Sequence, residues 1–582
     1  MDRNTVVRWA LIAAALLLFW KFGMPLITGG NKKPQTLSAE VFKNAPDFVP
    51  DKIDPKVDGK PNEPKEGELC ELKGERFKAQ LSSRGAAIVH LRLTDGQYAD
   101  DNGQIDMSTT PDHEQWRSLR TGFRANGADD QVDYDRFNWK LQPQESPSAC
   151  TFTYTDAKVE ITKTIRAASR AFELEMTTQV KNLTDAPKKH ALSTSIHAFR
   201  YNKEIKGKLG RVSPFMTDLA CAGTDEVVRK GKDDFKEGWV EKPSVDRFAA
   251  ISNYYFGQAI IPAAGDKPNC RIVADLLADK WAGANIPHDD ENAGAVYHAV
   301  LNYPTRELKP QEAVTYTQSA FFGPKERDAL AAAAGGRPKL GELINLGFFS
   351  PVAKVLVSIL LFFHGKLGNW GFAIILMTIC VRLVLFPLAI PGIKSSIAMR
   401  KLRPQIEAIH AKFKDDPEAR GLATLELQKK NGGNMLAGCL PQLAQMPVWW
   451  AMYTTLQTAV EMYHTKFAWF QDLSAPDKYF ILPIVLGGLG LLQARIMPQQ
   501  PGQDPAQQKM MMYMMPAIFT VMMLFLPAAL GVYMTTNSIL GIAQAKLIEH
   551  FAKKAMEKSQ KGEIGVTEVS STSALEKGKA RV

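Results

Sequence analysis

The chain has 582 residues, a length that excludes a single hydrophobic core and predicts two or more domains. Its mean hydropathy of −0.17 averages a soluble-like stretch over residues 30–335 with a strongly apolar remainder. In such a chain the net charge of +10 at pH 7 is interpreted by where the basic residues lie before it is interpreted as nucleic-acid binding.

The N-terminus carries a mostly apolar run from Trp9 to Ile27, preceded by Arg3 and Arg8. Bulky residues follow this run where a signal peptidase would need small ones, which favours an uncleaved transmembrane anchor over residues 1–28. Residues 29–66 are rich in Pro, Lys, Asp and Glu without apolar periodicity, and they predict a flexible linker.

Residues 67–338 show the period-two pattern of half-buried strands. Phe172 and Leu174 alternate with Glu173, and Gly, Asn, Asp and Pro interrupt similar runs throughout the region. This pattern predicts an antiparallel β-sandwich domain. Its histidines are scattered without ligand spacing, so neither a metal site nor a catalytic cluster is expected.

The soluble-like region also holds an even number of cysteines. Two disulfides are permitted, with three possible pairings, and free buried thiols are the alternative. The sequence leaves this choice open for Cys70, Cys150, Cys221 and Cys270.

The region after residue 338 is dominated by apolar segments. Residues 339–368 are interrupted by polar residues and predict an amphipathic helix in the membrane interface. Residues 369–550 then hold five segments long enough to span a bilayer, which makes six with the N-terminal anchor. The five segments are Trp370–Ile390, Leu440–Val460, Phe480–Met497, Met510–Leu526 and Ala528–Ile548.

Basic residues are concentrated in two places in this region. One is the loop 391–438, which predicts a helical hairpin with Asp416 as an N-cap and Pro417 at the first helical position. The other is the tail 551–582. The positive-inside rule places both in the cytoplasm, and an even number of spans agrees with two cytoplasmic termini. The β-domain is then periplasmic.

Arg382 lies in the second half of the first of these five segments. An arginine inside a spanning helix costs roughly 2.5–3.5 kcal/mol, so such a residue is a functional candidate. Thr378, four residues earlier, shares its helix face. Further polar residues in the spans predict a hydrophilic groove around this charge, with hydrogen bonding between helices as the alternative explanation. These residues include Gln442, Gln445, Thr535 and Asn537.

Five segments resemble the YidC/Oxa/Alb superfamily of membrane protein insertases, in the Gram-negative form with a large periplasmic domain. They are WGFAIILMTICVRLVLFPL at 370–388, AGCLPQLAQMPVWWAMY at 437–453, FAWFQDLSAPDKYFILPIVLG at 467–487, DPAQQKMMMYMMPAIFTVMMLFLPAALGVYMTTNSI at 504–539 and QAKLI at 544–548.

The resemblance implies a polytopic α-helical protein of the bacterial inner membrane. Five of six transmembrane helices would form the core, and the periplasmic domain would be an antiparallel β-supersandwich. It also implies that Tyr533 contacts substrate. The family often has a second aromatic residue at the next position, where this chain has Met534.

The implied activity is insertion and folding of inner-membrane proteins, alone or with the Sec translocon, through a positively charged groove open to cytoplasm and lipid. The cytoplasmic hairpin would receive the substrate with Arg400, Lys401 and Arg403. Expected partners are newly made membrane proteins, the Sec translocon, the ribosome and membrane lipids, with no specific nucleic acid sequence. No enzymatic activity, metal or cofactor is expected, and the ATP-binding pattern GxxxxGK[ST] is absent from the sequence.

Other functions remain open from sequence alone. A Sec-associated membrane chaperone without autonomous insertase activity would share every feature above. A transporter or channel predicts inverted repeats and paired intramembrane charges, and neither is found in the sequence. An anchored periplasmic enzyme would leave the five later spans unexplained.

Overall fold

The computed structural model describes most of the chain between residues 56 and 566. The described ranges are 56–57, 60–61, 67–100, 103–111, 116–124, 131–134, 137–144, 146–205, 213–235, 238–276, 294–413, 416–430, 435–496 and 510–566. The predicted anchor over 1–28 lies outside them, as does the predicted linker over 29–66 except for the short pair β1 (Lys56–Val57) and β2 (Lys60–Pro61). The chain divides into two compact units, which meet in sequence between Phe348 and Phe349.

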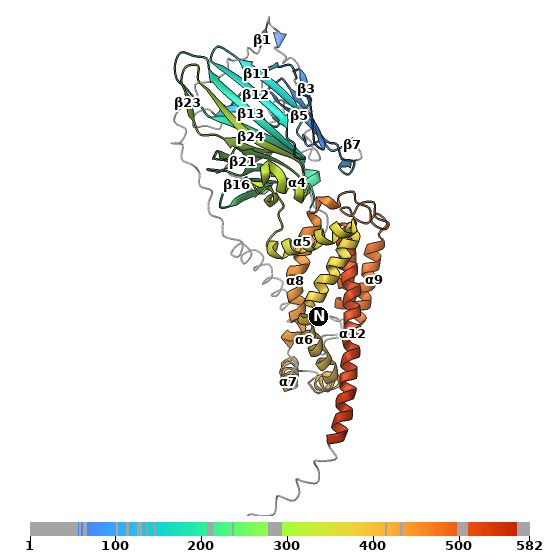
Figure 1. The fold of residues 1–582 in the computed structure, drawn as a ribbon. Helices are drawn as coiled ribbons and strands as arrows, with labels where there is room; N and C mark the ends of the chain where they lie inside the picture. Colours follow the sequence, from blue (N-terminus) through green and yellow to red (C-terminus); the bar gives the residue numbers. More distant parts are fainter. Residues whose placement is uncertain are drawn as a thin grey trace, which may run out of the picture. The chain divides into compact units, whose positions relative to one another are not determined.

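The first unit is built on two large antiparallel sheets, whose strands run side by side in Figure 1. The nine-stranded sheet contains, in spatial order, β10 (Lys140–Leu141), β11 (Ala149–Thr155), β12 (Val159–Ala167), β13 (Glu173–Asn182), β24 (Ala313–Pro324), β20 (Phe256–Pro262), β19 (Phe248–Ser252), β16 (Asp218–Ala222) and β17 (Val227–Gly231). The six-stranded sheet contains β18 (Val240–Lys242), β21 (Asn269–Leu276), β22 (Gly294–Asn302), β15 (Leu192–Tyr201), β8 (Arg120–Arg124) and β9 (Gln131–Asp133).

Smaller sheets and short helices complete this unit. The remaining strands are β3 (Leu69–Gly74), β4 (Phe77–Ser82), β5 (Ala87–Leu93), β6 (Ala99–Asp100), β7 (Gly103–Gln104), β14 (Lys188–His190) and β23 (Arg306–Leu308). The helices are α3 (Asn202–Ile205), α4 (Arg327–Ala332) and the 3₁₀ turns Lys232–Asp234, Ala333–Gly336 and Leu340–Leu343.

Strand β12 shows why the sequence alternation produces a sandwich. Val159, Ile161 and Ile165 are buried on one face, as the period of two requires. Lys163 falls on the same face and is fully buried, and its ammonium donates a hydrogen bond to the carbonyl of Leu119 beside the other sheet. Burial lowers the pKa of Lys163 to about 7. The two large sheets therefore face each other across the core.

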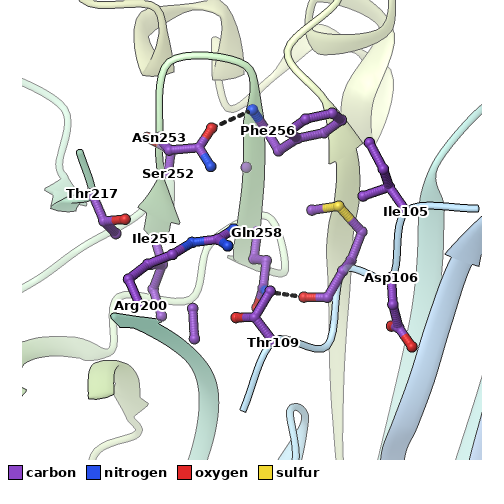
Figure 2. Close-up of a pocket in the computed structure, with 13 residues that line it drawn as sticks. Ile105, Asp106, Thr109, Arg200, Thr217, Ile251, Ser252, Asn253, Phe256 and Gln258 are labelled. Carbon is purple, nitrogen blue, oxygen red and sulfur yellow. Dashed lines mark hydrogen bonds between the residues drawn. The ribbon is translucent and has the colours of Figure 1, made fainter. Parts of the chain in front are cut away.

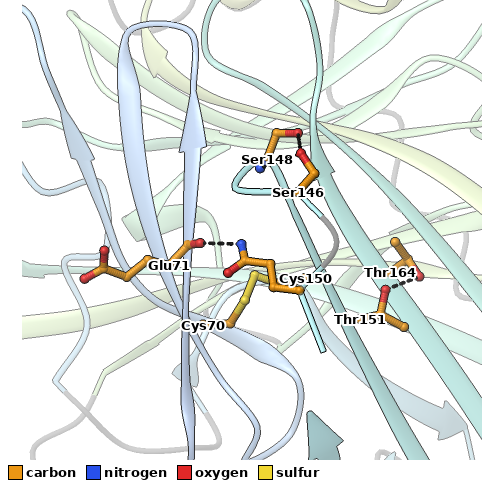
Figure 3. Close-up of a disulfide and its surroundings, with 8 residues drawn as sticks. Cys70, Glu71, Ser146, Ser148, Cys150, Thr151 and Thr164 are labelled. Atoms are coloured by element: carbon orange, nitrogen blue, oxygen red, sulfur yellow. Dashed lines mark hydrogen bonds between the residues drawn. A yellow bond between two sulfur atoms is a disulfide. The ribbon is translucent and has the colours of Figure 1, made fainter. Parts of the chain in front are cut away.

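Two disulfides join elements of the β unit. Cys70 on β3 bonds Cys150 on β11, as Figure 3 shows, and Cys221 on β16 bonds Cys270 on β21. The second bond links the nine-stranded sheet to the six-stranded sheet. The structure thus selects one of the three pairings that the sequence allowed, and among the described cysteines only Cys380 is free.

The second unit is helical. Its helices are α5 (Ser350–Leu367), α6 (Trp370–Lys412), α7 (Pro417–Lys430), α8 (Met435–Gln457), α9 (Ile481–Ile496), α11 (Met515–Met523) and α12 (Ala528–Val566), with a 3₁₀ turn at Val460–Met462 and a π-helical turn at Met510–Met514. Helices α6, α8 and α12 pack against one another, α9 packs on α12, and α11 packs on α9.

Local chemistry sets several helix ends. Gly368 closes α5 with a left-handed φ of 64°, which glycine adopts without strain. The Asn369 side chain then accepts a hydrogen bond from the backbone N–H of Phe372 at 3.1 Å and caps α6. The carboxylate of Asp416 accepts the N–H groups of Glu418 and Ala419, both at 3.0 Å, so its predicted N-cap role is confirmed.

The helix bounds differ from the sequence prediction in two places. Helix α6 runs without interruption past Pro387, Pro391 and Pro404, so the first predicted span and the first arm of the predicted hairpin are one helix. Each proline removes one backbone hydrogen bond, and here the rest of the helix holds across those gaps. Helix α12 also continues through residue 566 into the predicted tail.

Two described helical stretches are long and apolar enough to cross a membrane, namely Ser350–Leu367 and Trp370–Pro387. The apolar helices Ile481–Ile496 and Met512–Met523 are shorter. The first stretch falls in the segment expected to lie in the interface, and its position in the bilayer stays a prediction. The expected number of six spans likewise stays a prediction.

Candidate functional site

Arg382 on α6 is held by helix α12. Its Nε donates to the side-chain oxygen of Asn537 at 2.6 Å, and its Nη2 donates to the backbone oxygen of the same residue at 2.9 Å. Its Nη1 lies 3.4 Å from Oε1 of Gln544. Within the part of the chain that the structure describes, Arg382 forms no ion pair. The neutral amide and carbonyl groups of Asn537 and Gln544 thus position the guanidinium without neutralising its charge.

One face of α12 contacts Arg382 and leaves room for its guanidinium group. Asn537, Gly541 and Gln544 are spaced four and three residues apart, so they lie on the same side of the helix. A Cβ placed on Gly541 would lie 3.2 Å from Nη2 of Arg382, closer than most such contacts. The missing side chain therefore leaves room for the guanidinium group.

Asn537 also lines a groove between α8, α9, α11 and α12. The groove has a volume of about 520 Å³, and its wall is mostly apolar with amide and hydroxyl groups interspersed. The lining residues include Gln445, Met446, Trp449, Leu486, Gln493, Met515, Phe519, Tyr533, Met534, Asn537 and Ser538. Asn537 thus contacts the positively charged Arg382 and also forms part of a groove wall that suits apolar segments of a polypeptide.

The family model described as 60Kd inner membrane protein matches residues 362–556, and the model of the YidC periplasmic domain matches residues 70–359. The membrane protein insertase YidC of Anaeromyxobacter sp. (strain K) is 33% identical over 501 residues, which cover 83% of this chain and 85% of that protein. The chain belongs to the YidC family. The resemblance that the sequence motifs indicated is confirmed, and the matching family is one of inner membrane proteins.

Other YidC relatives are similar over much of the chain. The insertase YidC of Geobacter sulfurreducens is 32% identical over 397 residues, 68% of this chain and 69% of that protein. A crystal structure of an active YidC insertase with its first transmembrane domain resolved shares 17% identity over 82% of this chain and 94% of that chain, with a TM-score of 0.35.

Some of the residues predicted from the YidC motifs and from the polar positions in the spans lie together at the groove. Gln445, Tyr533 and Asn537 line the groove, and Arg382 joins them through Asn537. Met534, the residue after Tyr533, also lines the groove.

Other predicted site residues do not line the groove, or have side chains that the structure does not describe. Thr378 is 1% exposed, and its hydroxyl donates to the Ile374 carbonyl of its own helix at 2.7 Å, a local bond common for threonine in helices. Thr535 has a buried hydroxyl without a partner among the described residues and does not line the groove. The side chains of the remaining predicted residues are not described: Gln442 on α8, and Arg400, Lys401 and Arg403 on α6.

One groove glutamine was missing from the predicted site. Gln493 on α9 lines the groove. It carried a signal in the sequence, because it interrupts an otherwise apolar segment. Gln544 on α12, one of the polar residues that the last predicted span carries, contacts Arg382.

Proposed function

We propose that this chain inserts and folds integral proteins in the bacterial inner membrane, using the groove beside Arg382 to receive them. The observation that carries the proposal is the pairing of Arg382 with Asn537, because it holds a charge that no described acidic side chain compensates next to a groove wall that is mostly apolar. An arginine in a membrane segment is costly, and such residues mark functional sites by default.

In the first step, Arg382 attracts acidic residues in the tail of an arriving protein. Two opposite charges about 4 Å apart attract by about 4 kcal/mol at the effective dielectric found near a protein surface. Because the described partners of Arg382 are amide and carbonyl groups, its charge remains available to a carboxylate. This attraction offsets part of the cost of drawing a polar tail toward the membrane.

In the second step, the apolar part of the substrate contacts the groove wall and leaves sideways into lipid. Met446, Met515 and Met534 suit this role because methionine adapts to differently shaped partners. A groove of about 520 Å³ is too small to enclose a spanning helix of ~20 residues, so the substrate must leave it as the helix forms. Burial of apolar surface at ~25 cal/mol per Å² drives this release.

The proposal includes the topology expected from the charge pattern. Six spans, including the anchor over 1–28 and five in the core over 369–550, place both termini in the cytoplasm and residues 67–338 in the periplasm. The hairpin 391–438 receives the substrate. The basic tail 551–582 meets the ribosome or anionic lipid, since polyanions attract it, and the Sec translocon is a further partner.

Photo-crosslinking tests where the substrate passes. A photoreactive residue replaces Gln493, or as a control replaces Ile484 on the same helix α9, which is 69% exposed and does not line the groove. The full chain in proteoliposomes then receives a stalled single-span protein with an acidic tail. Adducts are expected mainly from the Gln493 position. Equal adducts from both positions would contradict a groove pathway.

The same proteoliposomes separate the two candidate activities. Insertion without the Sec translocon is expected for an autonomous insertase. Insertion that requires added Sec translocon would instead indicate a Sec-associated chaperone.

A further inference from the structure

The β unit contains a second, unrelated pocket between its two large sheets. Arg200 near the end of β15 comes from the six-stranded sheet, and Ser252 and Asn253 at the end of β19 come from the nine-stranded sheet. Thr217 and Gln258 complete its polar wall (Figure 2). The pocket has a volume of about 40 Å³.

Arg200 supplies the positive charge of this pocket. Within the described ranges its guanidinium makes no ion pair and no hydrogen bond, and its Cζ lies 5.4 Å from the centre of the Phe215 ring. Burial lowers the pKa of Arg200, while the charge of Glu204 opposes this shift. Arginine nevertheless stays charged in proteins, so this site holds a partly desolvated cation that forms no ion pair with any described acidic side chain.

Asn253 adds a donor to this pocket, because its acceptor oxygen is occupied. Asn253 accepts the N–H groups of Tyr255 and Phe256 through its side-chain oxygen, at 2.9 and 2.8 Å. This pairing fixes the amide orientation, and Figure 2 shows the amide nitrogen on the side facing Arg200. The Ser252 hydroxyl also lacks a partner among the described residues.

The one carboxylate in the pocket wall is already engaged. Asp106 contacts the ring nitrogen of His90 at 2.7 Å and accepts the backbone N–H groups of Leu91 and Ser108 at 3.0 and 2.9 Å. The nearby hydroxyl of Tyr297 is fully buried without a partner among the described residues. Burial raises the pKa of Tyr297, and the charge of Arg200 opposes that rise. The pocket thus presents unused donors around one cation.

The volume limits what can bind. One water needs roughly 10–15 Å³ of such space, so about 40 Å³ holds a group of three or four heavy atoms. A hexose is too large to enter. A carboxylate has the right size, and its two oxygens match the planar fork of a guanidinium group.

We infer that the pocket formed by Arg200, Ser252 and Asn253 is a carboxylate-binding site, which recognises either a small free carboxylate or an acidic side chain of a peptide. Arg200 would bind both oxygens, and Ser252 and Asn253 would each donate one hydrogen bond. This site is independent of the groove beside Arg382, because it lies in the other unit and uses no residue of the membrane core.

Binding to the full chain in nanodiscs tests this inference by saturation-transfer NMR. The probes are acetate, a blocked pentapeptide with a central glutamate, and the same peptide with glutamine. Acetate or the glutamate peptide is expected to bind, and the glutamine peptide is not. Binding of acetate alone would identify a free carboxylate as the ligand, and binding of the glutamate peptide alone would identify a peptide side chain.

Variants assign the binding to this pocket. Arg200→Gln is expected to weaken binding at least about tenfold, because it removes hydrogen bonds to a charged group. Ser252→Ala should weaken binding several-fold, and it provides the test if Arg200→Gln does not fold. The matched control is Arg166→Gln on β12, where the arginine is exposed and lies outside the pocket.

Three results would overturn the inference. The first is the absence of binding by both acetate and the glutamate peptide. The second is equal binding of the glutamate and glutamine peptides. The third is binding that persists unchanged in folded Arg200→Gln and Ser252→Ala variants.

Discussion

Arg382 and Asn537 stand 155 residues apart in sequence and meet through two hydrogen bonds, one to the asparagine side chain and one to its backbone. The contact joins α6 to α12. Because Asn537 also lines the groove, any change at this residue alters both the position of the charge and the groove wall. The first two predictions follow from this arrangement.

Asn537→Asp is expected to abolish most insertion of proteins with acidic tails while the chain stays folded. The new carboxylate would occupy the position of the amide oxygen 2.6 Å from Nε and would neutralise Arg382. Protease protection in proteoliposomes measures this effect. A substrate with an uncharged tail serves as the control and should lose much less. Equal losses for both substrates would argue against a role for the charge.

Gly541→Ala is expected to lower the unfolding temperature and to reduce insertion. The added methyl group would lie 3.2 Å from Nη2 of Arg382, and the guanidinium cannot move away without lengthening its bonds to Asn537. Gly488 on α9 is the matched control, since a Cβ there meets no atom within 4 Å. Gly488→Ala should be neutral or slightly stabilising. If the two variants have the same unfolding temperature and the same insertion activity, the close packing at Gly541 does not matter for function.

Removal of either disulfide is expected to destabilise the β unit. The cross-links Cys70–Cys150 and Cys221–Cys270 have sequence separations of 80 and 49 residues. On the chain-entropy account, loops of these lengths contribute about 4.5 and about 4 kcal/mol to the free energy of unfolding. Paired Cys→Ser variants of the full chain, followed by thermal unfolding, measure both. Unchanged unfolding of either variant would contradict this expectation for that disulfide.

The β unit is expected to lose stability as the pH falls from about 6.5 to about 4. Burial is the main cause that lowers the pKa of His190 to about 4, and burial also lowers the pKa of His197. A histidine with a depressed pKa in the folded state is neutral there but becomes protonated in the unfolded chain below about pH 6.5. Acid therefore favours unfolding until the folded-state pKa is reached.

His190→Gln tests this pH dependence. Glutamine can retain the hydrogen bond that His190 makes with the hydroxyl of Tyr316 at 2.9 Å, but it does not titrate. Thermal unfolding across the pH window should then depend less on pH than in the unchanged chain. A slope that is the same with and without His190 would show that its protonation does not govern acid stability.

Sequence patterns predicted those features that depend on local chemistry. Arg382 was recognisable because an arginine in an apolar segment is costly wherever the helix packs. The alternation in β12 predicted its buried face, and Asp416 before Pro417 predicted a helix start. Each of these signals lies within a few neighbouring residues.

Features that depend on distant contacts could not be predicted in the same way. Three cysteine pairings, and free thiols as the alternative, were open until the strands were placed beside one another. The sequence placed Arg382 and Asn537 in the same groove, but only packing of α6 on α12 shows that they bond. Thr378 shares a face with Arg382, yet the carbonyl of Ile374 satisfies its hydroxyl within the helix.

Insertion by charge variants of Arg382 tests the central claim most directly. The purified full chain, reconstituted alone in proteoliposomes, receives a single-span protein with an acidic N-terminal tail, and protease protection reports insertion. Arg382→Lys should have a mild effect, and Arg382→Glu should reduce insertion at least tenfold, since the ~4 kcal/mol attraction becomes repulsion. Insertion by Arg382→Glu at the level of the unchanged chain would contradict a groove that works through its positive charge.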